Sequence, residues 1–560
     1  MHLGPLSIIF NGEIYNHLEV RKKHNLECHS HSDTETILHA YRKLGAECLH
    51  DFDGMFAFAI YNRDANELFL ARDRAGEKPL YYNHEQDRFA FASEPGALFR
   101  QINAGLNDEN LLEYIRFGFF YKHKTPYSNI AELPAGSYGV YSLNRKQFDI
   151  FQWWNIRDKY AVRSNDDFNT ARNRVDELLH QSVKTRIESS DLEVGSFLSG
   201  GIDSGLVTAI ASKYKPSLKT FTVSFENGID EAPLAKLVAE RYQTKHHEIR
   251  ISFSDLVNDV EQILANYGEP HYDDSAIPSY YVSREAKKHL TVILNGDGGD
   301  ELFAGYRRYV PFSKVDFFAQ NGFQRFSFSV LKKLLPTASE KTSKLNYINR
   351  MLFLGSRTGF DTYLASTTDI FEGYEKDAFP ALPSMPPLQQ KELNEVLKGS
   401  FTGLQKQMIL DFETLLPGLL LVKMDIASMA NSLEGRSPFL SGELLDYVPS
   451  IADAYKIRGR TTKYLLRDLA RSYLPAELIN QPKRGFEPPI NTWVENDLRN
   501  MIGDYLHASD PLYARYIRKD FVSRLFDGRC SVQRDKRSKM IWMLFTLEVW
   551  YRKVYKSKQG

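Results

Sequence analysis

Phe197-Leu198-Ser199-Gly200-Gly201-Ile202-Asp203-Ser204-Gly205 is the stretch that decides the fold. An apolar run, 194–198, leads into it, and a helix-like run, 206–214, follows. Two glycines after a buried strand let backbone N–H groups close around an anion, and the next helix adds the positive end of its dipole. Ser199 and Ser204 supply hydroxyl donors, and Asp203 can hold a cation that accompanies the anion. The pattern favours a polyphosphate site, although a tight strand–helix turn without a ligand fits the same residues. No G-x-x-x-x-G-K-[ST] motif occurs, so this is not an ordinary NTPase loop.

Length and composition indicate a multidomain globular enzyme. The chain has 560 residues, which predicts two or three domains, and 42% of them are hydrophobic. Lys+Arg and Asp+Glu both number 71, so the chain has no overall basic charge. We therefore expect neither a nucleic-acid nor a membrane partner. The three cysteines, Cys28, Cys48 and Cys530, exclude a disulfide framework and a clustered thiolate metal site, and they fit a cytoplasmic location.

The chain changes pattern near residue 166. Before it, short aromatic-rich runs predict strands at 55–60, 67–71 and 88–92, with one helix at 34–44. After it, strands and helices alternate, which predicts a doubly wound parallel sheet that binds ligands beyond the carboxyl ends of its strands. The expected strands are 194–198, 219–225, 245–251 and 291–294, and the expected helices include 169–186, 206–214 and 231–242. From residue 307 onward the chain reads as mostly helical.

A second strand-end loop, Asn295-Gly296-Asp297-Gly298-Gly299-Asp300-Glu301, repeats the logic of the first but presents acids. In a parallel sheet both loops lie at the same edge, so Asp203 and Asp300 are expected to share one Mg²⁺ on a nucleotide's phosphates. A turn with helix-capping acids is the plainer interpretation. Two such loops in one sheet favour a site.

These motifs carry a family resemblance. Ser199–Ser204 resembles the pyrophosphate loop of the ATP-pyrophosphatase superfamily, and the whole set of motifs resembles glutamine-dependent asparagine synthetases. The further blocks run in family order over nearly the whole chain: 221–225, 245–248, 274–278, 295–301, 423–430, 434–440 and 482–486.

The resemblance implies two domains. Residues 1–155 would be an incomplete glutamine amidotransferase domain, a partial N-terminal-nucleophile sandwich. Residues 166–560 would be an ATP-pyrophosphatase domain with a helical C-terminal extension. The implied reaction uses ATP and Mg²⁺ to convert the aspartate side chain to β-aspartyl-AMP, after which ammonia displaces AMP to give asparagine.

The resemblance also assigns roles. The implied catalytic residues are Asp297 and Lys463, and the implied Mg²⁺ ligands are Asp203 and Asp300. The implied ATP-binding residues are Leu198, Ser199, Gly200, Gly201, Asp203, Ser204, Val223, Asn295 and Gly296. Without the resemblance, Lys463 would read as a solvated surface charge. His246 and His247 are adjacent in a strand, so their side chains point to opposite faces and a metal pair is not expected.

The N-terminal segment Asn11-Gly12-Glu13-Ile14-Tyr15-Asn16 resembles the family's glutaminase motif. By that resemblance Asn11 and Gly12 form an oxyanion hole, while Glu13 and Asp33 hold glutamine. The family's nucleophile is an N-terminal cysteine, whereas this chain begins Met1-His2. We therefore expect an N-terminally truncated sequence, with native loss of the glutaminase as the alternative.

Cys28, expected on a strand before Ser32-Asp33, lacks an adjacent free amine and is not expected to replace the missing nucleophile. As given, the chain is expected to use free ammonia, and the full-length protein glutamine.

Two rival functions stay open at this stage. One is amide formation or ring closure on another carboxylate, as in the related β-lactam synthetases, and the other is a non-catalytic ATP-binding scaffold. The expected partners are small-molecule substrates: aspartate or a similar acid, ATP, and glutamine or ammonia. The sequence sets neither the acid acceptor nor the ammonia route, and it leaves a homodimer open.

Overall fold

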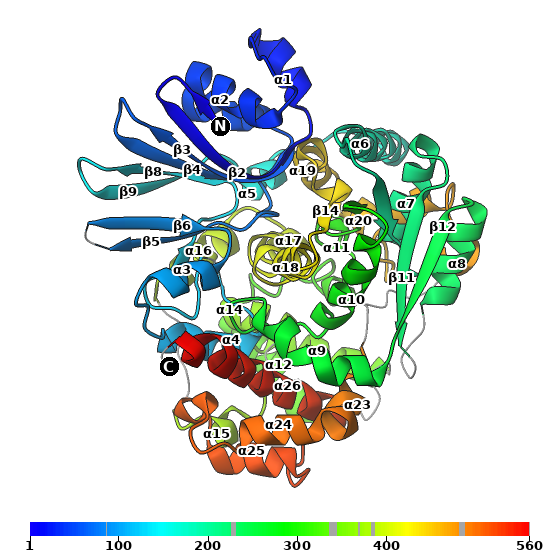
Figure 1. Ribbon diagram of the computed structural model, residues 1–560. Coiled ribbons are helices and arrows are strands. Elements are labelled where there is room, and N and C mark those ends of the chain that lie inside the picture. The colour runs from blue at the N-terminus through cyan, green and yellow to red at the C-terminus, as the bar shows by residue number, and fades with distance from the viewer. Residues whose placement is uncertain are drawn as a thin grey trace.

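The computed structural model describes residues 1–85, 87–121, 123–225, 231–334, 344–367, 370–381, 387–480 and 488–558. An N-terminal half built on antiparallel sheets lies beside a C-terminal half built on a parallel sheet, and helices fill the space below both (Figure 1). Among the described residues no helix is long and apolar enough to cross a membrane.

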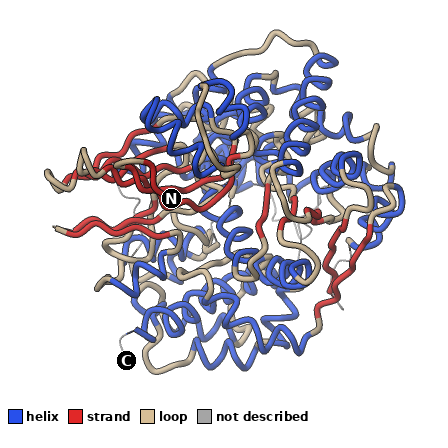
Figure 2. The backbone as a smooth tube through the Cα atoms, turned by 45° about the horizontal axis from the view of Figure 1, so that its top comes forward, coloured by secondary structure: helices blue, strands red, loops and turns tan. Residues whose placement is uncertain are grey.

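The N-terminal half is a two-layer sandwich. Its six-stranded sheet has the order β1-β2-β3-β4-β8-β9, and its three-stranded sheet has the order β6-β5-β7. Figure 2 shows the two layers of strands extending together on the left. The larger sheet contains β1 (His2–Leu3), β2 (Leu6–Ile14), β3 (Gly54–Asn62), β4 (Glu67–Arg72), β8 (Ser137–Ser142) and β9 (Gln147–Gln152). The smaller contains β5 (Tyr81–Glu85), β6 (Arg88–Ala92) and β7 (Ala131–Glu132). The predicted strands 55–60, 67–71 and 88–92 are confirmed.

The position of strand β3 between two cores explains why its sequence is an apolar run. Ala57 and Ala59 pack between the two sheets, whereas Phe56, Phe58 and Ile60 belong to the larger core on the other face. Both faces of β3 are therefore buried, so the strand reads as continuously apolar rather than alternating. The helices of this half are α1 (His17–His24), α2 (Asp33–Leu44), α3 (Pro95–Gln101) and α4 (Asp108–Phe117), followed by α5 (Ile156–Ala161).

The C-terminal half holds a five-stranded sheet of order β12-β11-β10-β13-β14 in which every neighbouring pair is parallel. Its strands are β10 (Val194–Phe197), β11 (Lys219–Phe225), β12 (Lys245–Ile251), β13 (Val292–Leu294) and β14 (Glu434–Arg436). Helices α8 (Ala232–Arg241) and α10 (Ala276–Lys287) lie on opposite sides of β11 and β12 (Figure 1). The sequence reading therefore gave the parallel sheet correctly, but it missed β14, which is short and polar.

The remaining helices surround this sheet. The helices before the helical region are α6 (Phe168–Glu188), α7 (Ile202–Tyr214), α9 (Phe253–Ala265) and α11 (Gly299–Leu302). The helical region contains α12 (Gly322–Leu334), α13 (Lys344–Gly355), α14 (Phe360–Ser366), α15 (Glu375–Ala378), α16 (Pro387–Lys398), α17 (Gly403–Glu413), α18 (Val422–Met429), α19 (Gly442–Tyr447), α20 (Asp453–Lys456), α21 (Tyr464–Ala470), α22 (Ala476–Ile479), α23 (Ile490–Thr492), α24 (Arg499–Leu506), α25 (Lys519–Phe526) and α26 (Arg534–Trp550). From Met540 to Trp550 helix α26 is buried on all sides, which is typical of a core helix.

Candidate functional site

The turn between β10 and α7 forms one wall of a cavity of about 420 Å³. Within the turn, Ser204 Oγ lies 2.8 Å from Ser199 Oγ, and the Ser199 N–H donates to Ser204 Oγ at 3.1 Å. Leu198, Gly201 and Asp203 also line the cavity. Gly200 does not line it, because its Cα faces α8 and an added Cβ would lie 3.1 Å from Leu234 Cβ. The turn therefore presents hydroxyl and backbone donors to an open space.

The loop between β13 and α11 forms the facing wall. A Cβ added at Gly296 would lie 3.0 Å from both Asp203 Cβ and the Ser204 nitrogen, so the two loops touch. Gly298 adopts a left-handed conformation at φ +85°, which favours glycine. Asn295 Nδ2 donates to Asp297 Oδ2 at 2.8 Å and so orients this acid. The carboxyl ends of β10 and β13 thus meet at one edge, as parallel strands require.

Lys463 joins the acids of the two loops. It lies immediately before α21, is 3% exposed, and has a left-handed backbone at φ +52°. Its Nζ donates to Asp203 Oδ2 and lies 2.6 Å from Asp300 Oδ1. Only a glycine fits at Gly305, because a Cβ there would lie 1.8 Å from Asp300 Oδ1. The surface position that helical spacing alone indicates for Lys463 is wrong: its ammonium is buried between two carboxylates.

The donor set suits a hard cation. Asp203 Oδ1 is buried without a hydrogen-bond partner, and it lies beside the Asp300 carboxylate across the shared lysine. Mg²⁺ prefers carboxylate oxygens together with substrate phosphates. Asp203 and Asp300 therefore fit a Mg²⁺ ion that arrives with a nucleotide.

A second group of charges lies beside Asp297. Burial raises the pKa of Asp297 to about 6, and Lys423 opposes that rise. Lys423 Nζ lies 3.5 Å from Asp273 Oδ2. Burial raises the pKa of Glu301 to about 7, and the Tyr306 hydroxyl donates to its carboxyl group. A carboxyl group that titrates near neutral pH inside a cavity is suited to proton transfer.

The sequence reading gave no role to Asp273, Lys423, Glu301 or Tyr306, all of which line the cavity or its edge. The available signal was the acid pair Asp273-Asp274 before α10, together with the charged pair Lys423 and Asp425 in the block 423–430. Spacing alone could not show that α18 approaches the β13 loop.

A much smaller cavity, of about 20 Å³, also borders Asp297, and no residue of the β10 turn lines it. Asn295, Asp297 and Met424 line both cavities, whereas Met55, Glu77 and Lys78 of the N-terminal half line only the small one. This volume is about that of one water molecule. Asp297 therefore lies between the large cavity and strand β3.

The predicted glutamine-binding residues gather where β2 ends. Gly12 has φ +138°, and a Cβ there would lie 2.0 Å from Met55 O, so a side chain is excluded. The Ile14 N–H donates to Asp33 Oδ2 at 3.0 Å, which ties the strand end to the start of α2. Burial raises the pKa of Glu13 to about 7, against the effect of Arg436, whose guanidinium lies 3.6 Å away. Asn11 lies one residue before Gly12 on β2, opposite Ala57.

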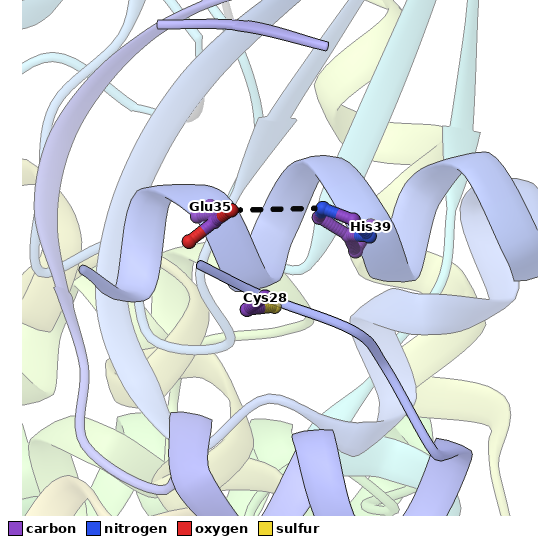
Figure 3. A group of neighbouring side chains, drawn as sticks. All are labelled: Cys28, Glu35 and His39. Carbon is purple, nitrogen blue, oxygen red and sulfur yellow. Dashed lines mark ion pairs between the residues drawn. The ribbon is translucent and has the colours of Figure 1, made fainter. Parts of the chain in front are cut away.

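Cys28 lies in the loop between α1 and α2, not on the strand that the sequence indicated. Its sulfur gathers with Glu35 and His39 of α2 (Figure 3), and the donor atoms lie within 4.8 Å of one another. Glu35 already accepts three hydrogen bonds from His29 and Ser30, so its carboxylate holds this loop. Burial raises the pKa of Cys28, which disfavours the nucleophilic thiolate.

The structure describes the histidine pair singled out in the sequence, but not the basic pair near residue 483. His246 Nδ1 lies 3.0 Å from Thr220 Oγ1, whereas the His247 ring stacks on Phe221, so the two side chains face opposite sides as expected. Lys483 and Arg484, part of the last resemblance block, lie outside the described residues.

Comparisons with known proteins match both halves. A model of the asparagine synthase family matches residues 174–552, and a model of the glutamine amidotransferase domain matches residues 2–154. The chain is 33% identical over 560 residues to asparagine synthetase [glutamine-hydrolyzing] 1 of Bacillus subtilis, covering 97% of this chain and 85% of that protein. It is 31% identical over 501 residues to a putative asparagine synthetase of Mycobacterium bovis, covering 87% of this chain and 75% of that protein. It is 35% identical over 320 residues to a putative asparagine synthetase of Methanocaldococcus jannaschii, covering 56% of this chain and 61% of that protein.

Proposed function

The chain belongs to the asparagine synthase family of ligases, and we propose that it forms asparagine from aspartate in the large cavity, through a β-aspartyl-AMP intermediate. The observation that carries this proposal is the cluster of Asp203, Asp300 and Lys463 at adjoining strand ends, with Asp297 beside it. We assign residues 1–155 to the glutamine amidotransferase domain and residues 166–560 to the synthetase domain.

The first step requires activation, because a carboxylate is a poor electrophile. An oxygen of the aspartate side chain attacks the α-phosphorus of ATP, and pyrophosphate leaves. We assign the pyrophosphate end of ATP to Ser199, Gly201 and Ser204, whose donors face the cavity. Positioning and charge stabilisation supply most of the catalysis in such phosphorus chemistry. We assign to Lys463 the stabilisation of the negative charge that develops on the phosphate oxygens.

Gly200 is assigned to the same turn, where its lack of a side chain lets the turn pass α8. Leu198, Val223 and Gly296 would border the adenosine, with Asn295 beside them. A Mg²⁺ ion held by Asp203 and Asp300 would neutralise phosphate charge when it is bound. The unpartnered Asp203 Oδ1 supports this assignment.

The second step forms the amide. Ammonia attacks the acyl carbon, AMP leaves with the bridging oxygen, and one proton must leave the nitrogen. Asp297 is assigned as the acceptor of that proton, because its pKa of about 6 leaves it ionised at neutral pH. The small cavity between Asp297 and Met55 supports delivery of ammonia from the N-terminal half.

The nitrogen source follows from the N-terminal half. We assign the oxyanion hole to Asn11 and Gly12 and glutamine binding to Glu13 and Asp33, with glutamine as the nitrogen source in the full-length protein. Free ammonia is the nitrogen source that we propose for the chain as given, since burial disfavours the thiolate of Cys28.

ATP–pyrophosphate exchange tests the first step without any nitrogen source. Aspartate, among a panel of carboxylic acids, should drive exchange by the wild-type chain. Asp203→Ala and Lys463→Ala should abolish exchange, whereas Lys519→Ala, at an exposed lysine of α25, should not. Exchange driven only by another acid would reject aspartate, and exchange that survives in both site variants would reject the site.

A further inference from the structure

Helix α12 turns an apolar stripe toward solvent. Phe323 is 79% exposed, Leu334 74% and Phe326 67%, and Val330 and Leu331 are also exposed. These five residues recur at the spacing of one helical face. Among the described residues the other exposed large apolar side chains are spread over many separate elements. Single exposed apolar residues are ordinary, whereas a contiguous stripe marks a binding surface.

The opposite side of α12 is already packed. The Phe328 ring lies so close to α13 that a Cβ added at Gly355 would approach it to 2.6 Å. Lys332 Nζ lies over the Phe353 ring, 3.9 Å from its centroid, and Arg325 donates to Thr358 Oγ1 at 3.2 Å. Helix α12 is therefore fixed to α13 by the face opposite the stripe. The apolar stripe itself stays exposed.

Helices α12 and α13 carry a local excess of positive charge. The two helices contain five lysines and arginines, Arg325, Lys332, Lys333, Lys344 and Arg350, although the whole chain is balanced at 71 of each sign. The described residues of α12 and α13 include no acid. The net charge of the whole sequence is zero and does not reveal this local excess of positive charge. The expectation of no membrane partner was based on that net charge alone.

We propose that the exposed apolar stripe of α12 is a peripheral docking surface for an anionic lipid membrane. Helices that combine phenylalanine and leucine on one face with lysine and arginine elsewhere lie in the interfacial plane of a bilayer. Basic residues near the surface add electrostatic attraction to anionic headgroups. This surface association needs no spanning helix, and it is independent of the proposed reaction.

A second copy of this chain is the competing occupant. A two-fold interface would place the same surface of both copies face to face, and here that would bring together two copies of α12, a helix with three basic residues and no acid. Like charges that face each other across an interface oppose association. The positive charge of α12 and α13 therefore favours an anionic surface over self-association.

Vesicle flotation of the full chain tests the proposal. Binding should be strong to vesicles of equal parts phosphatidylcholine and phosphatidylglycerol, weak to phosphatidylcholine alone, and reduced by added salt. The double variant Phe323→Ser/Phe326→Ser should weaken binding by roughly tenfold or more per phenylalanine. The matched control Phe151→Ser, at an exposed phenylalanine of β9, should bind as the wild type does.

Circular dichroism and ATP–pyrophosphate exchange confirm that the variants fold, because α12 lies outside the proposed site. Absence of wild-type binding to the anionic vesicles would overturn the proposal, and so would unchanged binding by the folded double variant. A wild-type dimer that the double variant converts to a monomer, without vesicle binding, would assign the stripe to a second copy instead.

Discussion

Replacing Lys463 by methionine should destabilise the ligand-free protein through charge rather than packing. Asp203 and Asp300 are each only 14% exposed, and the lysine ammonium contacts both. Breaking a buried ion pair by removing one partner costs about 3–5 kcal/mol, because the remaining charge is left uncompensated. Two carboxylates face the vacated position, so the upper part of that range is expected for the free energy of unfolding.

A divalent cation should reverse part of this loss. Mg²⁺ would replace the missing positive charge between the carboxylates, and a ligand at a hundred times its Kd adds about 2.7 kcal/mol to the stability of the folded state. In the wild type the ammonium occupies that position, so Mg²⁺ without nucleotide should have a smaller effect. The measurement is urea unfolding of both proteins, with and without Mg²⁺.

Lys456→Met is the matched control. Lys456 is also fully buried, but among the described residues its Nζ donates to two backbone carbonyls, those of Pro449 and Ile451, each at 3.1 Å, and to no carboxylate. Its removal leaves no bare carboxylate, so Mg²⁺ should not restore stability to this variant. The charge argument fails if Lys463→Met is as stable as the wild type, or if Mg²⁺ stabilises all three proteins equally.

Three further predictions concern other parts of the molecule. Asp297→Asn should preserve ATP–pyrophosphate exchange but slow amide formation. At a fixed concentration of free ammonia, the wild-type rate of amide formation should rise as the pH increases through about 6, where Asp297 ionises, and the rate of the variant should not show that rise. Gly12→Ala should lower the free energy of unfolding by more than about 2 kcal/mol, because the added Cβ meets a backbone oxygen. The control Gly459→Ala, at a glycine with positive φ and open space around it, should lower it by only about 1 kcal/mol, and equal losses of stability in thermal melts would contradict this. Lys78→Met should cost about 3–5 kcal/mol in urea unfolding, because Asp425 is left as a buried charge, and Asp425→Leu added to it should recover most of the loss; additive losses would show that the pair is uncoupled.

The sequence predicted the parts of the fold that have strong local signals. The strands 219–225 and 245–251 match β11 and β12 residue for residue, because both are bounded by clear changes of pattern. It missed β14, whose residues Glu434–Arg436 are polar and follow a long helical segment. Three residues at a sheet edge carry no periodicity that a pattern could detect.

The candidate site was predictable where its residues share a loop. Asp203 and Asp300 could be brought together from topology alone, because parallel strand ends share an edge. The burial of Lys463 could not, since its partner Asp203 lies 260 residues away in sequence. Asp273 and Glu77 were missed for the same reason: each acquires its environment from an element remote in the chain.

The contacts between the two halves explain how Asp297 comes to face strand β3. One apolar core runs continuously through both halves, so adhesion does not depend on ion pairs. Lys78 nevertheless donates to Asp425 at 2.8 Å, and Arg436 lies 3.6 Å from Glu13. Buried ion pairs add little net stability compared with apolar packing, but they tolerate only one geometry. We therefore interpret these pairs as fixing the orientation of the halves, because a shift along the apolar surface would break both pairs and misalign the small cavity.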